Sequence, residues 1–309
     1  MGNTEGLLSG NTCFRMEELD MKLENEYLCV EISEEGAELT RIYDKQKRND
    51  ILWEGNPKYW KRHSPVLFPN VGKTYHNTVR IQGIQYPTSQ HGFARDNTFT
   101  CITSKKDTAQ FLLLSNEETK EVYPFDFELY ITYTLKGKTI DVQWKVRNPM
   151  DETIYFTIGG HPAFRFAEEE GKKANYCLRF PEKECLSYIL INPESGTGNV
   201  DEVFEMALED GVYPLSEEMF KKDALIFDNG QIEEVWICTK DGKPYVGMRC
   251  EDFPNFGIWS VKDAPFVCLE PWAGRCDNHG FEGEISEKPG INEVEGRGTF
   301  IKGYQIIVA

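Results

Sequence analysis

The chain has few basic side chains for its 309 residues: 34 lysines and arginines stand against 51 aspartates and glutamates, a formal net charge of −17. Binding to nucleic acid needs a basic surface, and so does attraction to an anionic membrane. We therefore expect neither partner. A neutral or cationic small molecule suits this charge better, although a local basic pocket could still hold a phosphate.

The nine cysteines lack Cys-x-x-Cys spacing, so we expect neither a disulfide framework nor a thiolate zinc site. Cys29, Cys238 and Cys268 lie inside apolar runs, where a free thiol packs as a small hydrophobe. No apolar run approaches ~20 residues, and no basic-then-apolar leader pattern is present. These absences predict a protein of the reducing cytoplasm.

Helical periodicity, internal repeats and linker-like segments are also scarce, whereas alternation with period two is common. It is clearest in residues 127–135 and 140–146, which predict a β-hairpin around Gly137. Residues 28–32 and 37–43 predict a second hairpin. Further strands of similar length are expected at 153–158, 176–180, 224–227, 235–239, 245–249, 257–261 and 300–308.

Short helices are expected at 116–122 and 216–222, where a capping residue precedes acidic ones. Many short strands with few helices predict an all-β, antiparallel sandwich or barrel. Residues 1–20 show no periodicity and are interpreted as a flexible tail, with one domain over 21–309.

The apolar run at 266–272 ends in a carboxylate, Glu270, followed by Pro271 and Trp272. Such a run predicts a buried strand. We expect Pro271 to stop the ladder and Glu270 to lie at the mouth of the strand. Partial burial there would raise the pKa of Glu270 and make it a better proton acceptor when ionised. The alternative is a strand-end glutamate that faces water.

Three loops carry further candidate groups. In the first, Gly159 and Gly160 permit close backbone approach, and His161 follows with a side chain suited to proton transfer near neutrality. His91 precedes a glycine in the second, and Lys73 follows one in the third, where it could contact a hydroxyl or an anion. Each could instead be structural or simply solvated.

Three tryptophans, Trp60, Trp259 and Trp272, lie near these loops and could stack on a sugar, although aromatic residues are chiefly core material. The chain has no phosphate-binding P-loop, no dinucleotide fingerprint and no serine nucleophile elbow.

Together these stretches resemble the aldose 1-epimerase (galactose mutarotase) family, and in particular its LacX-like branch. The resemblance extends from Leu28 to the last expected strand. It is carried by the segments 67–73, 91–93, 160–164, 256–259 and 269–272, and the tail 283–292 resembles the same branch.

The resemblance implies a large antiparallel β-sandwich that interconverts the α and β anomers of a free hexose without a cofactor. Glu270 matches the family's general base and His161 its general acid. His91 matches the histidine that holds the ring oxygen or a hydroxyl. Lys73 stands where many members have arginine, and a lysine lacks the planar fork of arginine. Asp223 is our choice for the substrate-binding aspartate, and Trp272 is expected to contact the sugar.

This chemistry needs one group to take the proton of the anomeric hydroxyl while another protonates the ring oxygen. We expect Glu270 and His161 on opposite sides of the C1–O5 bond, facing each other across a sugar-sized hollow. A nearby carboxylate would raise the pKa of His161 and keep the ring protonated.

Three alternatives remain from the sequence. His91, His161 and Glu270 could form the two-histidine, one-carboxylate metal set of an oxygenase. The fold could be a non-catalytic carbohydrate-binding protein. The substrate could also be a hexose 6-phosphate, held by Lys61, Arg62, Lys73 and Arg95. The favoured hexose, the oligomeric state and the role of the stretch 275–298 are not determined by the sequence.

Overall fold

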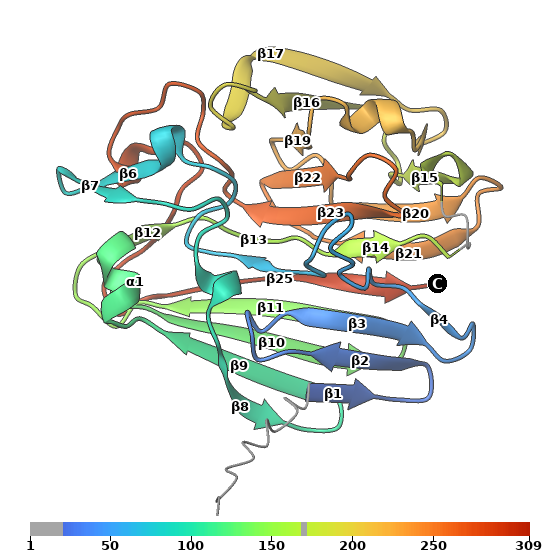
Figure 1. Ribbon diagram of the computed structural model, residues 1–309, viewed down its shortest axis with the longest axis horizontal. Helices are drawn as coiled ribbons and strands as arrows, with labels where there is room; N and C mark the ends of the chain where they lie inside the picture. Colours follow the sequence, from blue (N-terminus) through green and yellow to red (C-terminus); the bar gives the residue numbers. More distant parts are fainter. Residues whose placement is uncertain (1–20, 168–171) are drawn as a thin grey trace, which may run out of the picture.

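The computed structural model describes residues 21–167 and 172–309, and strands dominate it (Figure 1). The expected tail at 1–20 lies outside the described residues, and the single domain over 21–309 stays a prediction. No helix in the described part of the chain is long and apolar enough to cross a membrane. The described cysteines are free thiols.

The largest sheet has nine antiparallel strands. Its order is β18 (Val212–Pro214), β15 (Tyr176–Arg179), β20 (Glu234–Thr239), β21 (Pro244–Arg249), β25 (Thr299–Val308), β11 (Thr139–Arg147), β10 (Glu128–Lys136), β9 (Thr108–Leu114) and β8 (Thr100–Ser104).

A second sheet has eight strands and carries the site described below. Its order is β17 (Gly198–Ala207), β16 (Cys185–Ile191), β19 (Leu225–Phe227), β22 (Asn255–Trp259), β23 (Phe266–Ala273), β13 (Ile158–Gly160) and β5 (Val66–Leu67), and β14 (Ala163–Arg165) pairs with β23.

Smaller elements complete the fold. A four-stranded sheet contains β1 (Met21–Glu24), β2 (Leu28–Ile32), β3 (Leu39–Asp44) and β4 (Asn49–Asp50); two-stranded sheets are formed by β6 (Thr78–Ile81) with β7 (Ile84–Pro87) and by β12 (Ile154–Phe156) with β24 (Asn292–Val294). The helices are α1 (Glu117–Val122) and the 3-10 turns η1 (Tyr75–Asn77), η2 (Ala94–Asp96), η3 (Lys173–Asn175), η4 (Glu217–Phe220) and η5 (Ile285–Glu287).

One hydrophobic core joins the three larger sheets. It includes fully buried side chains such as Ile42 from β3, Ile131 from β10 and Leu269 from β23. Sheets that bury one face each against a shared core form a sandwich. The all-β, antiparallel prediction is therefore confirmed.

The predicted hairpin around Gly137 is confirmed, since β10 and β11 pair from Glu128↔Arg147 to Lys136↔Thr139 and their burial alternates along both strands. The hairpin of β2 and β3 is also confirmed. Helix α1 begins as expected after Asn116, whose side chain accepts the Thr119 N–H at 2.9 Å.

Two expectations about the extent of secondary-structure elements were wrong. The strand expected at 153–158 is divided between β12 and β13, which belong to different sheets. The chain leaves the first ladder at Thr157, whose N–H donates to Pro69 and whose hydroxyl accepts the Val71 N–H. The helix expected at 216–222 is only the 3-10 turn η4, and the Ser216 side chain makes no capping hydrogen bond.

Pro271 does not end its strand, because β23 continues to Ala273 and Pro271 is paired in register with Phe256 of β22. On the other side of β23 the ladder is interrupted between β14 and β13. A proline, which has no N–H to donate, is tolerated beside such a break. Glu270 consequently lies inside a strand rather than at its end.

The buried ring of Trp144 tests the contribution of the core to stability. It is 1% exposed in β11 and contacts the rings of Tyr304 and Phe253. We expect Trp144→Ala to lower the free energy of unfolding by about 3–5 kcal/mol, since it leaves a cavity. The neighbouring Gln143→Ala, on the exposed face of the same strand, should change it by less than about 0.5 kcal/mol. Equal effects in denaturant titrations would contradict this account of the core.

Candidate active site

The register of two short ladders brings Glu270 and His161 together. Gly159 of β13 pairs with Trp272, and Ala163 of β14 pairs with Cys268, so the same register runs through both ladders. Residues 160–162 bridge the break between them, which places His161 directly opposite Glu270. Opposite side chains on antiparallel segments lie within contact distance. Accordingly, His161 Nε2 is 3.3 Å from a carboxylate oxygen of Glu270.

A cavity of about 1210 Å³ opens above this pair. Its wall includes every residue that the sequence singled out for the site: Lys73, His91, His161, Asp223, Glu270 and Trp272. The structure therefore brings together groups from distant parts of the chain. It differs from expectation in one respect: His161 and Glu270 lie side by side and do not face each other across the hollow.

Trp272 is packed against two glycines of neighbouring strands. A Cβ atom on Gly159 would lie 2.4 Å from the indole Cδ1, and one on Gly257 would lie 2.3 Å from Cζ2. Real Cβ atoms do not approach so closely, so the ring requires glycine at both positions. The close approach at Gly159 thus accommodates the side chain of Trp272.

The imidazole of His161 is held by aromatic rings. It stacks on Trp60 with ring centroids 4.7 Å apart, and it meets the edge of Trp259 at 5.5 Å. Within the described residues its Nδ1 is buried without a hydrogen-bond partner. The orientation of the ring is therefore set by packing and by Glu270, since no hydrogen bond to Nδ1 contributes.

Burial pushes both groups of the pair toward their neutral forms. His161 is 6% exposed and Glu270 is 1% exposed. Burial, followed by the positive charge of Arg95, lowers the pKa of His161 to about 3. Burial, followed by the negative charge of Asp223, raises the pKa of Glu270 well above its ordinary value. The expectation that the pKa of His161 is raised was wrong, because desolvation outweighs the attraction of the carboxyl group.

His91 lies next to His161, with ring centroids 5.5 Å apart. Its Nδ1 accepts the N–H of Gly72 at 3.1 Å, so in the neutral ring Nε2 carries the proton. Burial is the main cause that lowers the pKa of His91 well below its ordinary value, and repulsion between the His91 and His161 rings when both are protonated adds to it. His91 is therefore a neutral hydrogen-bond donor at the cavity wall.

Lys73 and Asp223 approach the cavity from different elements. The stem of Lys73 contacts the turn at Gly196, where an added Cβ would lie 2.7 Å from Lys73 Cδ. Asp223 lies after η4 in the left-handed region, with φ of 76°. Its influence on the pKa of Glu270 places its charge near the pair.

Arg62 and Arg95 lie together at the wall of this cavity. They are two of the four basic residues that the sequence suggested for binding a hexose 6-phosphate. Both contact Asp96: Arg62 Nη2 lies 2.7 Å from one carboxylate oxygen and Arg95 Nε 3.7 Å from the other. Burial and the neighbouring Arg62 lower the pKa of Arg95 to about 10, so it stays charged at neutral pH. Two cations thus share one carboxylate.

Sequence reasoning missed the segment 192–196, which lines the cavity and approaches the Lys73 side chain at Gly196. It has no periodicity or motif, and its place depends on the turn that follows β16. Trp60 was noted only as lying near a candidate loop, whereas the structure shows it stacked on His161.

The geometry does not favour the two-histidine metal set. Within residues 21–167 and 172–309, the compact group of possible ligands is His161, Cys268 and Glu270, without His91. Burial raises the pKa of the Cys268 thiol well above its ordinary value, so the thiolate that binds metals is disfavoured. The Nδ1 atom of His91 is already occupied by the Gly72 N–H.

Comparison with known proteins agrees with this fold. The chain matches the aldose 1-epimerase family over residues 20–195. It is 30% identical over 298 residues to protein LacX of Lactococcus lactis subsp. lactis, covering 94% of this chain and 99% of the relative.

Solved structures extend the likeness to the whole fold. A galactose mutarotase related enzyme from Lactobacillus acidophilus has a TM-score of 0.89 at 32% identity, covering 94% of this chain and 97% of that one. A galactose mutarotase-like protein from Lactobacillus casei has a TM-score of 0.85 at 27% identity, covering 94% and 100%. The resemblance to the LacX-like branch and the sandwich of the galactose mutarotase type are thereby confirmed, and the chain belongs to the aldose 1-epimerase family.

Proposed function

We propose that this protein is a mutarotase that interconverts the α and β anomers of a free hexose by general acid and base catalysis. The observation that carries the proposal is the contact of 3.3 Å between His161 and Glu270 at the wall of a sugar-sized cavity. Membership of the family supports an epimerase, and the intact acid and base positions speak against a purely sugar-binding protein.

Adjacent catalytic groups suit the reaction as well as opposed ones. The anomeric hydroxyl O1 and the ring oxygen O5 are bonded to the same carbon, so neighbouring side chains can reach both. Glu270 takes the proton of O1 while His161 protonates O5, and the C1–O5 bond breaks. After rotation about C1–C2, reversed proton transfers close the ring on the other face.

The pair needs one proton in total for this step. In the empty, buried site the proton resides on Glu270, because both residues are then neutral. Transfer across the 3.3 Å contact produces the carboxylate and imidazolium that the reaction uses. The two arrangements are tautomers with the same proton count and titrate as one coupled system. His91 donates from Nε2 to a sugar oxygen, and Lys73 and Asp223 contact hydroxyls.

A hexose 6-phosphate is the second candidate substrate, and a specific observation favours it. The described residues that line the cavity include more cationic side chains than anionic ones, although the whole chain carries a net charge of −17. Arg62 and Arg95 share a single carboxylate, which leaves positive charge available for a phosphate.

Replacement of the base tests the mechanism. Glu270→Gln keeps the shape of the side chain but cannot take a proton, so we expect kcat to fall by ~10²–10⁴-fold. Sugar binding should change by only a few-fold. Polarimetry measures the exchange of anomers, and calorimetry measures binding. Glu251→Gln, on an exposed residue away from the cavity, is the control. A Glu270→Gln enzyme within a few-fold of the wild type would exclude Glu270 as the base.

The protonation of the pair tests the effect of burial. Because the pKa of His161 is lowered to about 3, its ring should stay uncharged from pH 8 down to pH 5 in the sugar-free protein. The acidic limb of kcat/KM then belongs to His161 and the basic limb to Glu270. NMR titration of the histidine rings measures this, with exposed His76 as the internal reference. A His161 ring that becomes charged near pH 6.5 or above would refute this assignment.

The two substrate candidates are separated by comparing glucose and galactose with their 6-phosphates. For a free-hexose enzyme we expect kcat/KM to be higher with the free sugar, and Arg62→Gln should change that value by less than about three-fold. A preference of ten-fold or more for a 6-phosphate, lost in Arg62→Gln, would instead establish the phosphorylated substrate. Lys47→Gln, on an exposed lysine that does not line the cavity, controls for the loss of one positive charge.

A further inference from the structure

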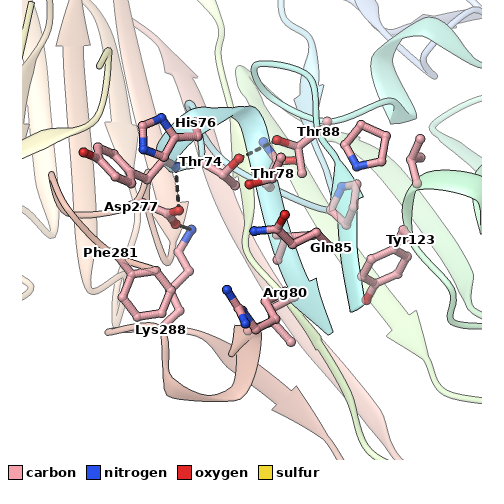
Figure 2. Close-up of a pocket in the computed structure, with 18 of the residues that line it drawn as sticks. Thr74, His76, Thr78, Arg80, Gln85, Thr88, Tyr123, Asp277, Phe281 and Lys288 are labelled. Atoms are coloured by element: carbon pink, nitrogen blue, oxygen red, sulfur yellow. Dashed lines mark hydrogen bonds and ion pairs between the residues drawn. The ribbon is translucent and has the colours of Figure 1, made fainter. Parts of the chain in front are cut away.

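A second cavity has a volume of about 620 Å³ and is drawn in Figure 2. It is enclosed by the β6–β7 hairpin, by the end of α1 and by the segment 277–291. Its volume falls in the range of small-molecule sites, roughly 300–1,000 Å³. No residue proposed above for catalysis or hexose binding lines it.

The two cavities share their dividing wall. In the loop after β5, Gly72 and Lys73 line the sugar cavity, whereas Asn70 and Thr74 line the second one. In the neighbouring loop, His91 lines the sugar cavity and Gly92 lines the second cavity. The Asn70 amide donates to the carbonyls of Gly72 and Ser89 and so ties these two loops together.

Much of the wall of the second cavity is apolar. It includes Val79, Phe93, Tyr123, Phe281, Ile285 and Ile291. The polar end of Tyr123 is already satisfied, because its hydroxyl donates to the carbonyl of Tyr155 at 2.9 Å. These side chains offer an apolar surface for the body of a ligand.

Among the described residues at this wall, Arg80 is the charged group with no side chain of opposite charge or histidine beside it. Lys288 and Asp277 form a buried ion pair at 2.8 Å, each side chain 5% exposed, and Asp277 also accepts the Tyr75 N–H. His76 and Glu282 lie 3.9 Å apart in exposed positions. Arg80 forms no ion pair with any residue that the structure describes, and its Nε is buried without a hydrogen-bond partner there.

Gln85 provides a second polar group beside this arginine. Arg80 of β6 and Gln85 of β7 are partners in the hairpin register, so their side chains extend from the same face. Figure 2 shows both in the middle of the pocket, between Phe281 and Tyr123. A guanidinium group and an amide placed together can bind a carboxylate or phosphate through several N–H donors.

We propose that this second cavity binds a small organic anion, whose carboxylate or phosphate contacts Arg80 and Gln85 and whose apolar body packs against Phe281 and Tyr123. A buried polar nitrogen without a partner is costly, and an anion supplies the missing acceptor. The planar guanidinium of arginine can bind either a carboxylate or a phosphate. Because Lys288 and Asp277 neutralise each other, Arg80 is the positive charge that attracts the anion.

Three probes that share the naphthalene ring system test the proposal. They are 1-naphthoate, 1-naphthyl phosphate and the neutral 1-naphthylmethanol, and each is titrated by calorimetry into the whole protein. We expect at least one anion to bind ten-fold or more tightly than the alcohol. The tighter of the two anions identifies the preferred acid group. Equal affinities for all three probes, or no binding at millimolar concentration, would overturn the proposal.

Matched variants locate the site. Arg80→Gln should weaken binding of the preferred anion by ten-fold or more and leave the alcohol within two-fold. Gln85→Trp, which fills the cavity from an exposed hairpin position, should weaken all three probes. Arg249→Gln, on an exposed arginine of the nine-stranded sheet, should change nothing. Circular dichroism verifies that each variant is folded.

Two results would overturn the assignment to this cavity: anion binding that Arg80→Gln leaves unchanged, and displacement of the probe by a hexose or a hexose 6-phosphate, which would place it in the sugar cavity. Since the measurement is binding and not turnover, its result is independent of whether the protein is a mutarotase.

Discussion

The site depends on the register of β23 against two short strands. Because β13 and β14 pair with β23 in one continuous register, the segment between them must hold His161 opposite Glu270. A shift by one residue would turn the Glu270 side chain to the other face of the sheet. The packing of Trp272 over Gly159 and Gly257 stabilises this register, since the indole fits only where both strands lack a Cβ.

Burial of His161 and Glu270 then determines the protonation state of each group. An exposed carboxyl group and an exposed imidazole would each titrate near its ordinary pKa. Here desolvation drives both groups toward their neutral forms. The nearby arginines act in the same direction on His161. A bound sugar, with its many hydroxyl groups, can supply hydrogen bonds that the empty cavity lacks and so favour the charged tautomer.

The loops that position Lys73 and His91 have two faces, and each face borders a different cavity. Asn70 joins the two loops through hydrogen bonds to their carbonyls. A ligand in the second cavity would therefore contact the segments that shape the sugar site. In Figure 1 the β6–β7 hairpin, which carries Arg80, lies at the left edge of the fold, where β7 contacts α1.

Much of the fold could be predicted from the sequence because β10 and β11 alternate with period two over their whole length. Alternation is a local property, and so is the capping of α1 by Asn116. The division between β12 and β13 could not be predicted, because it depends on the bonds of Thr157 to a loop about 90 residues earlier. The segment 192–196 was missed because it carries no periodicity or motif.

The sequence by itself determined the residue types of the site: a carboxylate in an apolar run, a histidine after two glycines, and a family resemblance that connects them. Only the tertiary structure decided that these two groups touch, that burial makes both neutral, and that Arg62 and Arg95 line the same cavity and act on the charge of His161. Contact and desolvation are properties of side chains brought together from distant strands, and no local pattern along the chain encodes them.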